Sequence, residues 1–157
     1  MINLSRLRPW AAIPLRLIVG FGFIAHGYAK LMKGTENFAA ILQALGVPAP
    51  HWAAWMTVIV EIGGGLAVLF GAFVALASIP MAAVLLTAMF TVHLPYGFSA
   101  IKLQAVTAAG PQFGPPGYEV DLLYLACLFA LVIGGPGPLA IDGFIRNRKS
   151  RYLKPTS

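Results

Sequence analysis

Four apolar stretches, each close to the length of a helix that crosses a membrane, constrain this chain more than any other feature. Crossing about 30 Å of hydrocarbon takes roughly 20 helical residues at 1.5 Å each. Windows of this kind cover residues 11–31, 53–71, 73–94 and 118–135. In the last window the uninterrupted apolar run is shorter, from Leu122 to Ile133. The pattern predicts an all-α integral membrane protein in which four helices form a bundle.

The composition argues against an ordinary soluble domain. Hydrophobic residues make up 59% of the 157 residues and charged residues 10%, against about 45–50% and about 25% in soluble domains. A soluble domain of this length leaves about a third of its surface in water, and this sequence lacks the polar side chains to cover it. We therefore expect one domain, residues 1–157, surrounded by the lipid bilayer.

Basic residues indicate on which side of the membrane the two ends lie. Arg6 and Arg8 precede the first window, and five more basic residues follow the last one: Arg146, Arg148, Lys149, Arg151 and Lys154. Lys and Arg accumulate on the cytoplasmic side, and an even number of crossings brings both ends together. This predicts a multi-pass protein of a bacterial-type cytoplasmic (inner) membrane with both termini cytoplasmic. The net charge of +6 then reflects membrane anchoring, and no nucleic-acid partner is expected.

Turn-forming residues predict the connections between the helices. The second and third windows meet at residues 70–72 without a charge, which predicts a tight helical hairpin, and Pro80 predicts a kink in the third helix. The longer segments 32–52 and 95–117 are expected to be outer loops. After a glycine- and proline-rich stretch, Asp142 is expected to cap a short amphipathic helix, residues 142–153, on the cytoplasmic leaflet.

Ionisable side chains inside the windows need a partner or a purpose, because insertion costs about 2.5–3.5 kcal/mol for each. At 100° per residue, Arg16, His26 and Lys30 share one face of the first helix, and Glu61 lies on a small-residue face of the second. We expect these faces to meet. Arg16 is then expected to reach Glu61. The pair is either a structural ion pair or part of a site in which Glu61 and His26 handle protons or bind a ligand.

Two further polar residues are candidate ligand-binding groups at the outer mouth of the bundle. His93 ends the third window and is expected to face the same vestibule as His26, so bis-histidine haem ligation stays an alternative. Glu119, at the start of the fourth window, is expected either to be solvated at a helix N-terminus or to contact Lys30 or Lys33. No metal site is predicted.

Several short motifs combine polar residues with glycine near the helix ends. They are Arg16-Leu17-Ile18-Val19-Gly20, His26-Gly27-Tyr28-Ala29-Lys30-Leu31, Gly46-Val47-Pro48, Glu61-Ile62-Gly63-Gly64-Gly65, Leu69-Phe70-Gly71, Gly117-Tyr118-Glu119, and Gly135-Pro136-Gly137 followed by Asp142. Together these motifs resemble the DoxX family of small membrane proteins over roughly residues 10–145. The resemblance implies a four-helix membrane bundle. Its polar signature would be Arg16, His26, Lys30, Glu61 and Glu119.

The resemblance also implies a role in quinone-linked redox chemistry, because the family is named for a thiosulfate:quinone oxidoreductase subunit. Some members are associated with membrane assemblies that handle thiol and superoxide stress. The chain would bind a quinone or a similar lipid-soluble ligand near Glu61 and His26, with no covalently bound cofactor. Whether the chain is itself catalytic stays open.

Cys127 is the only cysteine, which excludes an internal disulfide, a CxxC redox pair and a thiolate iron–sulfur site. Electrons would therefore come from a protein partner in a membrane complex. A non-catalytic structural or assembly subunit of such a complex is the alternative, and a small-solute transporter is a third possibility.

Overall fold

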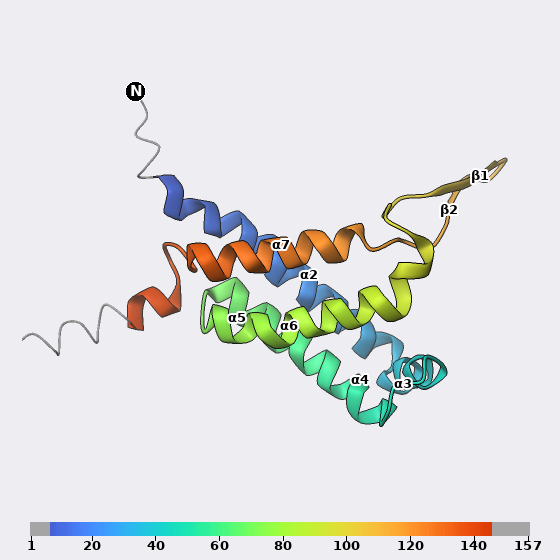
Figure 1. Ribbon diagram of the computed structural model, residues 1–157, viewed down its shortest axis with the longest axis horizontal. Helices are drawn as coiled ribbons and strands as arrows, with labels where there is room; N and C mark the ends of the chain where they lie inside the picture. Colours follow the sequence, from blue (N-terminus) through green and yellow to red (C-terminus); the bar gives the residue numbers. More distant parts are fainter. Residues whose placement is uncertain (1–6, 146–157) are drawn as a thin grey trace, which may run out of the picture.

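The computed structural model describes residues 7–145 and is mostly helical (Figure 1). In chain order the elements are η1 (Arg8–Ala11), α2 (Ala12–Lys33), α3 (Thr35–Ala44), α4 (Pro50–Ile59), η2 (Val60–Gly64), α5 (Gly65–Phe70), α6 (Val74–Ala88), η3 (Met89–His93), η4 (Leu94–Tyr96), β1 (Leu103–Thr107), β2 (Gly110–Phe113) and α7 (Glu119–Gly134). η1 and η4 are 3-10 turns, whereas η2 and η3 are π-helical turns within longer helices.

Three helical runs among the described residues are long and apolar enough to cross a membrane. They are Arg8–Lys33, Pro50–Phe70 and Val74–Tyr96, and they match the first three predicted windows to within three residues at each end. α7 occupies the fourth window, but its 16 residues extend only about 24 Å, which is less than the hydrocarbon thickness. The chain is thus a membrane protein with several apolar helices.

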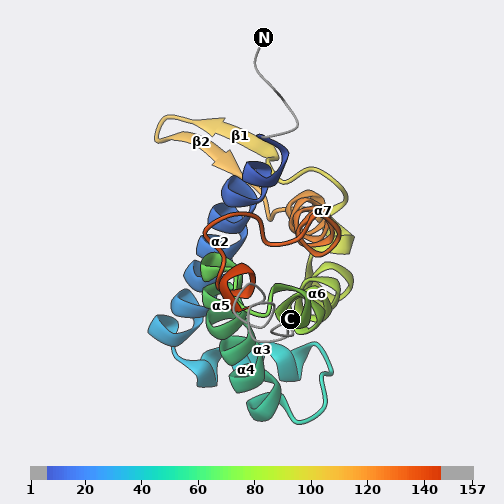
Figure 2. The same ribbon diagram turned by 90° about the vertical axis from the view of Figure 1, so that its left-hand side faces the viewer.

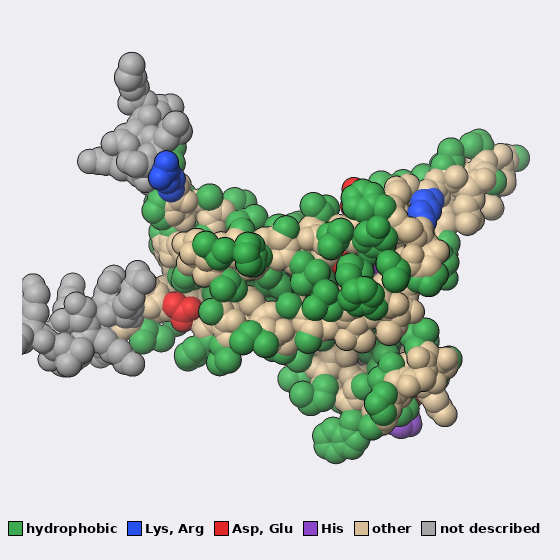
Figure 3. Space-filling model, viewed as in Figure 1, with side chains coloured by type: hydrophobic (Ala, Val, Ile, Leu, Met, Phe, Trp, Pro, Cys, Tyr) green, Lys and Arg blue, Asp and Glu red, His purple; other side chains and the backbone are tan. Residues whose placement is uncertain are grey.

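These helices pack side by side (Figure 2). α2 contacts the α4–η2–α5 run and α7, while α6 contacts η2, α5 and α7. The side chains enclosed between them are apolar and include Val19, Phe23, Val68, Met81 and Leu131. Apolar side chains are also spread along the whole helical surface that faces the viewer in Figure 3, with few charged side chains among them. A surface of this kind is suited to lipid, in agreement with the length of the helices.

Both predicted outer loops contain regular structure. α3 lies within the first, and β1 and β2 form an antiparallel hairpin in the second, with Leu103 opposite Phe113 and Thr107 opposite Gly110. The prediction of an all-α fold was therefore wrong in this segment. The β-branched residues Val106 and Thr107 favour a strand, and Gly110, at φ +113°, allows the tight reversal.

The end of the molecule opposite the hairpin carries the start of α2, the α5–α6 turn and residues 135–145 (Figure 1). Residues 141–145 are helical, so a helix begins where the amphipathic helix was predicted, and the rest of that prediction lies outside the described residues. Asp142 does not cap this helix. Its carboxylate accepts hydrogen bonds from the backbone N–H groups of Phe73 (2.8 Å) and Val74 (3.2 Å), and it therefore caps α6.

Candidate functional site

Glu61 lies in the π-helical turn η2, between two apolar helices, and is only 5% exposed. The ammonium group of Lys30, on α2, donates to both of its carboxylate oxygens at 2.7 Å. The Lys30 side chain is 22% exposed, and its ammonium group lies 5.1 Å from the centre of the Phe38 ring on α3. The pair is therefore enclosed by side chains from three helices.

Glycines allow α2 to approach the second helix closely enough for this pair to form. A Cβ added at Gly20 would lie 2.8 Å from the carbonyl oxygen of Gly65, and one added at Gly65 would lie 2.8 Å from that of Gly20. Near the ion pair, a Cβ at Gly27 would lie 3.0 Å from the Cβ of Glu61. The small-residue faces of the two helices thus meet as the sequence predicts, in the manner of other membrane helix pairs.

Arg16 does not pair with Glu61, and that prediction was wrong. Its guanidinium group donates to five carbonyl oxygens, which belong to Val68 (3.2 Å), Leu69 (2.8 Å), Pro136 (3.1 Å), Pro138 (3.1 Å) and Leu139 (3.4 Å). Guanidinium has five N–H donors, so these contacts can occupy its hydrogen-bonding capacity. Arg16 caps the carbonyl end of α5 and holds the loop that follows α7.

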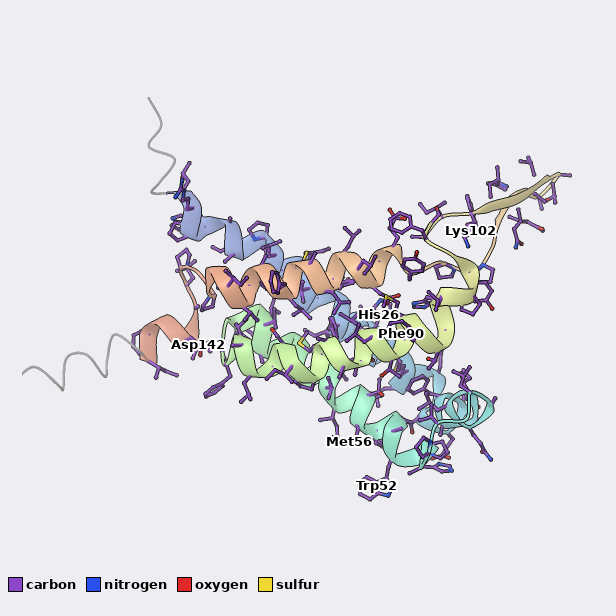
Figure 4. All side chains as sticks on the ribbon, in the orientation of Figure 1. His26, Trp52, Met56, Phe90, Lys102 and Asp142 are labelled. Atoms are coloured by element: carbon purple, nitrogen blue, oxygen red, sulfur yellow. The ribbon has the colours of Figure 1, made fainter. Side chains whose placement is uncertain are left out.

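His26 is exposed on α2 and takes part in no hydrogen bond or ion pair within residues 7–145 (Figure 4). At 100° per residue, His26 lies at one edge of the polar face of α2. It is about 100° around the helix from Gly27, which packs against the second helix. The structure therefore brings Lys30, but not His26, to Glu61.

His93 and Asp121 form a second polar contact, between η3 and the first turn of α7. His93 Nδ1 lies 2.5 Å from an Asp121 carboxylate oxygen, and Asp121 is 5% exposed. This pairing of His93 differs from the predicted approach to His26. Sequence reasoning missed Asp121 as a partner, although its place in the first turn of an apolar helix marks it as a buried carboxylate.

Glu119 accepts a hydrogen bond from the backbone N–H of Ala100 at 2.9 Å. This contact ties the base of the β-hairpin to the start of α7. Of the two alternatives expected for Glu119, the contact with Lys30 or Lys33 is not formed. Within residues 7–145 no group of three or more His, Cys, Asp and Glu side chains is arranged to hold a metal ion.

Two hollows lie near Arg16, at the end of the helices away from Lys30. One, of about 520 Å³, is lined by residues of the 137–144 segment, and the other, of about 100 Å³, lies between Arg16, Leu69 and Leu139. Neither borders Glu61.

The sequence model of the DoxX family matches residues 11–94, which include α2, Lys30, Glu61 and η3. The chain belongs to the DoxX family. It is 28% identical to an uncharacterised protein of Haemophilus influenzae over 90% of this chain and 96% of that protein. No solved structure gives a significant match to the chain.

Two other relatives of this DoxX protein carry more informative names. CatD of Bacillus subtilis, whose name describes it provisionally as an oxidoreductase, is 28% identical over 83% of this chain and 84% of its own length. The inner membrane protein YqjF of Escherichia coli is 24% identical over 92% of this chain and 99% of its own length. The similarity to both extends past residue 94, because it covers more of the chain than the family model does.

Proposed function

We propose that this DoxX protein is the membrane subunit of a quinone-linked oxidoreductase system, in which Lys30 and Glu61 bind the head group of a quinone or a similar lipid-soluble ligand. The observation that carries the proposal is the ion pair between Lys30 and the buried Glu61, which lies in the π-helical turn η2, because π-helical turns within α-helices are frequent at functional sites. The name of the Bacillus subtilis relative supports the oxidoreductase class.

The chemistry of the two side chains suits both forms of such a ligand. The Lys30 ammonium can donate a hydrogen bond to a quinone carbonyl, and the Glu61 carboxylate can accept one from a quinol hydroxyl. Glu61 is almost fully enclosed, so a ligand would enter past Lys30 and Phe38, the more exposed side of the pair. Electrons would reach the ligand from a protein partner.

We also propose that α7 crosses the membrane as a fourth helix, which puts both ends of the chain on the cytoplasmic side of a bacterial-type inner membrane. α7 packs along α6 and α2, and the segments that flank it reach the two ends of the neighbouring helices. At one end Gly137 packs against Pro9 and Ala12, and at the other Tyr118 bonds to Gly97, next to η4. The name of the Escherichia coli relative supports the location.

Quinone content after gentle purification tests the ligand proposal. The wild-type protein is expected to retain quinone detectable by mass spectrometry, and Glu61→Gln and Lys30→Met are expected to lose most of it. Glu36→Gln is the matched control, because Glu36 is an exposed glutamate that pairs with His51 at the surface. Equal quinone content in Glu61→Gln, Lys30→Met and the wild type would refute the assignment.

A non-catalytic structural or assembly subunit is the second candidate. It is favoured because the charged side chains between the helices already have hydrogen-bond or ion-pair partners within the chain. Arg16 is bound by carbonyls, Lys30 by Glu61 and Asp121 by His93, and no buried side-chain nitrogen or oxygen in residues 7–145 lacks a hydrogen-bond partner. This role predicts a stable partner complex that contains no quinone and is unaffected by Glu61→Gln.

A further inference from the structure

The second buried pair, His93 and Asp121, lies on different helices from the first and takes no part in the site proposed above. Asp121 is enclosed, with 7% of its side chain exposed, whereas 26% of the His93 side chain is accessible. The carboxylate is therefore the inner member of the pair and the imidazole the outer one. Like Glu61, His93 lies in a π-helical turn, η3.

The contact determines which atom of His93 is available to a ligand. An ionised carboxylate only accepts hydrogen bonds, so with Asp121 ionised the contact assigns the hydrogen to Nδ1, which donates it to Asp121 Oδ2. In the neutral ring, the other nitrogen, Nε2, is then an acceptor. No group in residues 7–145 hydrogen bonds to Nε2. A carboxylate that orients an imidazole in this way also fixes the basic nitrogen in enzyme dyads.

The surroundings indicate a ligand that is partly apolar. His93 lies three residues before the end of the Val74–Tyr96 run, close to where that helix leaves the membrane. The exposed side chains of Phe90, one turn earlier, and Leu94 flank it along the helix. The titratable groups within three residues of either member are Tyr96, Tyr118, Glu119 and Tyr124, and the Glu119 carboxylate accepts a hydrogen bond from the Ala100 N–H.

We propose that His93, oriented by Asp121, forms a second ligand site where η3 meets the start of α7, and that Nε2 there accepts a hydrogen bond from the hydroxyl group of a quinol-type ligand. This inference rests on the quinone-linked role proposed above. It assigns Asp121 as a positioning residue and His93 as the group that touches the ligand.

The test observes the His93 ring directly. The full chain with His26→Gln and His51→Gln carries one histidine, and ¹⁵N-histidine labelling in lipid nanodiscs then reports on His93 alone. The expected neutral form has hydrogen on Nδ1 and a bare Nε2. Menadiol, kept reduced, is expected to shift the Nε2 resonance, whereas 1,4-dimethoxy-2-methylnaphthalene, the same ring system without hydroxyl groups, is expected to leave it unchanged.

The Asp121→Asn variant tests whether the menadiol response requires Asp121 to orient the His93 ring, or only requires His93 to lie near the ligand. It is expected to mix the two neutral tautomers and to remove the menadiol response, while thermal unfolding of the same sample shows whether the fold survives. If that variant does not fold, the comparison of menadiol with the dimethoxy compound in the protein that retains Asp121 still tests the proposal. No shift with menadiol, or an equal shift with both compounds, would overturn the proposal.

The outcomes also separate this site from the Lys30–Glu61 site. If Glu61→Gln loses its quinone but menadiol leaves His93 unaffected, only the His93 site fails. If menadiol shifts His93 but Glu61→Gln keeps its quinone, the His93 site is supported and the assignment to Lys30 and Glu61 fails. If neither responds, the quinone-linked role fails, and this inference with it.

Discussion

Lys30 and Glu61 illustrate how single residues control the stability of this protein. Both lie on apolar helices, where an isolated charge is costly, and each makes the other tolerable through two contacts of 2.7 Å. Removing one member leaves the other buried without a partner, whereas removing both is often nearly neutral. A single substitution at either residue is therefore expected to destabilise the fold, whatever ligand the pair binds.

A double-mutant cycle tests this coupling. Lys30→Met is expected to lower the free energy of unfolding by about 3–5 kcal/mol, because it leaves the buried Glu61 charge unpaired. Glu61→Gln is expected to lower it less, because the Lys30 side chain is 22% exposed. The double variant is expected to lose less than the sum of the two. Thermal unfolding in detergent measures the cycle, and His51→Gln with Glu36→Gln is the exposed control, for which little change is expected. Additive losses at Lys30 and Glu61 would mean that the two charges are not coupled.

Two neighbouring glycines test the close approach of α2. Gly65→Ala places a methyl group 2.8 Å from the Gly20 carbonyl oxygen, and this overpacking is expected to cost about 1–3 kcal/mol. Gly63→Ala is the matched control, because a Cβ there meets no atom within 4 Å, and alanine is the better helix former. Thermal unfolding should therefore separate the variants, and equal effects would contradict the packing described here.

The sequence identified the polar face of α2 but not the partner of Glu61. Helical arithmetic places both Arg16 and Lys30 on that face, but it does not fix how far one helix is shifted along the other. The π-helical turn at residues 60–64 also changes the local direction of side chains. The carbonyls that bind Arg16 at Pro136 and Leu139 lie more than 100 residues away in sequence, so no local pattern could reveal them.

At the scale of elements, α6 depends on a cap supplied from a distant segment. Its N-cap residue, Phe73, has φ +50° and no polar side chain, so it cannot cap the helix itself. Asp142 provides the missing acceptors and, through its own N–H, donates to the Gly71 carbonyl at 3.0 Å. The turn between α5 and α6 is thereby joined to the segment after α7.

Asp142→Ala is expected to destabilise the start of α6 by about 0.5–2 kcal/mol, the usual cost of losing a cap. Hydrogen exchange should show faster exchange of the Phe73 and Val74 amides, with the amides of η3 at the far end of the same helical run unchanged. Asp142→Asn, which keeps one acceptor oxygen, should show a smaller effect. Equal exchange in Asp142→Ala and the wild type would show that the cap contributes nothing.

Among the elements, the helices were predictable from the sequence and the outer connections were not. The long apolar runs stand out because lipid requires nearly every exposed side chain to be apolar. α3 and the β1–β2 hairpin are short and mostly exposed, and the position of the hairpin depends on contacts such as the hydrogen bond from the Ala100 N–H to Glu119. The sequence alone could not supply those contacts.

At the scale of the whole molecule, polar contacts tie the helices together at both ends. Lys30–Glu61 joins α2 to η2, and His93–Asp121 joins η3 to α7. At the opposite end, Arg16 and Asp142 hold the segment after α7 against α5 and α6. α7 lies between these two ends, and the proposed topology, with both termini on one side, depends on α7 crossing the membrane as a fourth helix.

Cysteine accessibility in intact cells tests the fourth crossing most directly. In a Cys127→Ala background, which has no native cysteine, Ser99→Cys lies in the connection before α7 and Ser150→Cys after it. With α7 as a fourth crossing, a membrane-impermeant maleimide is expected to label the first variant in intact cells and the second only after the membrane is opened. Labelling of both variants in intact cells, or of neither, would contradict a fourth crossing.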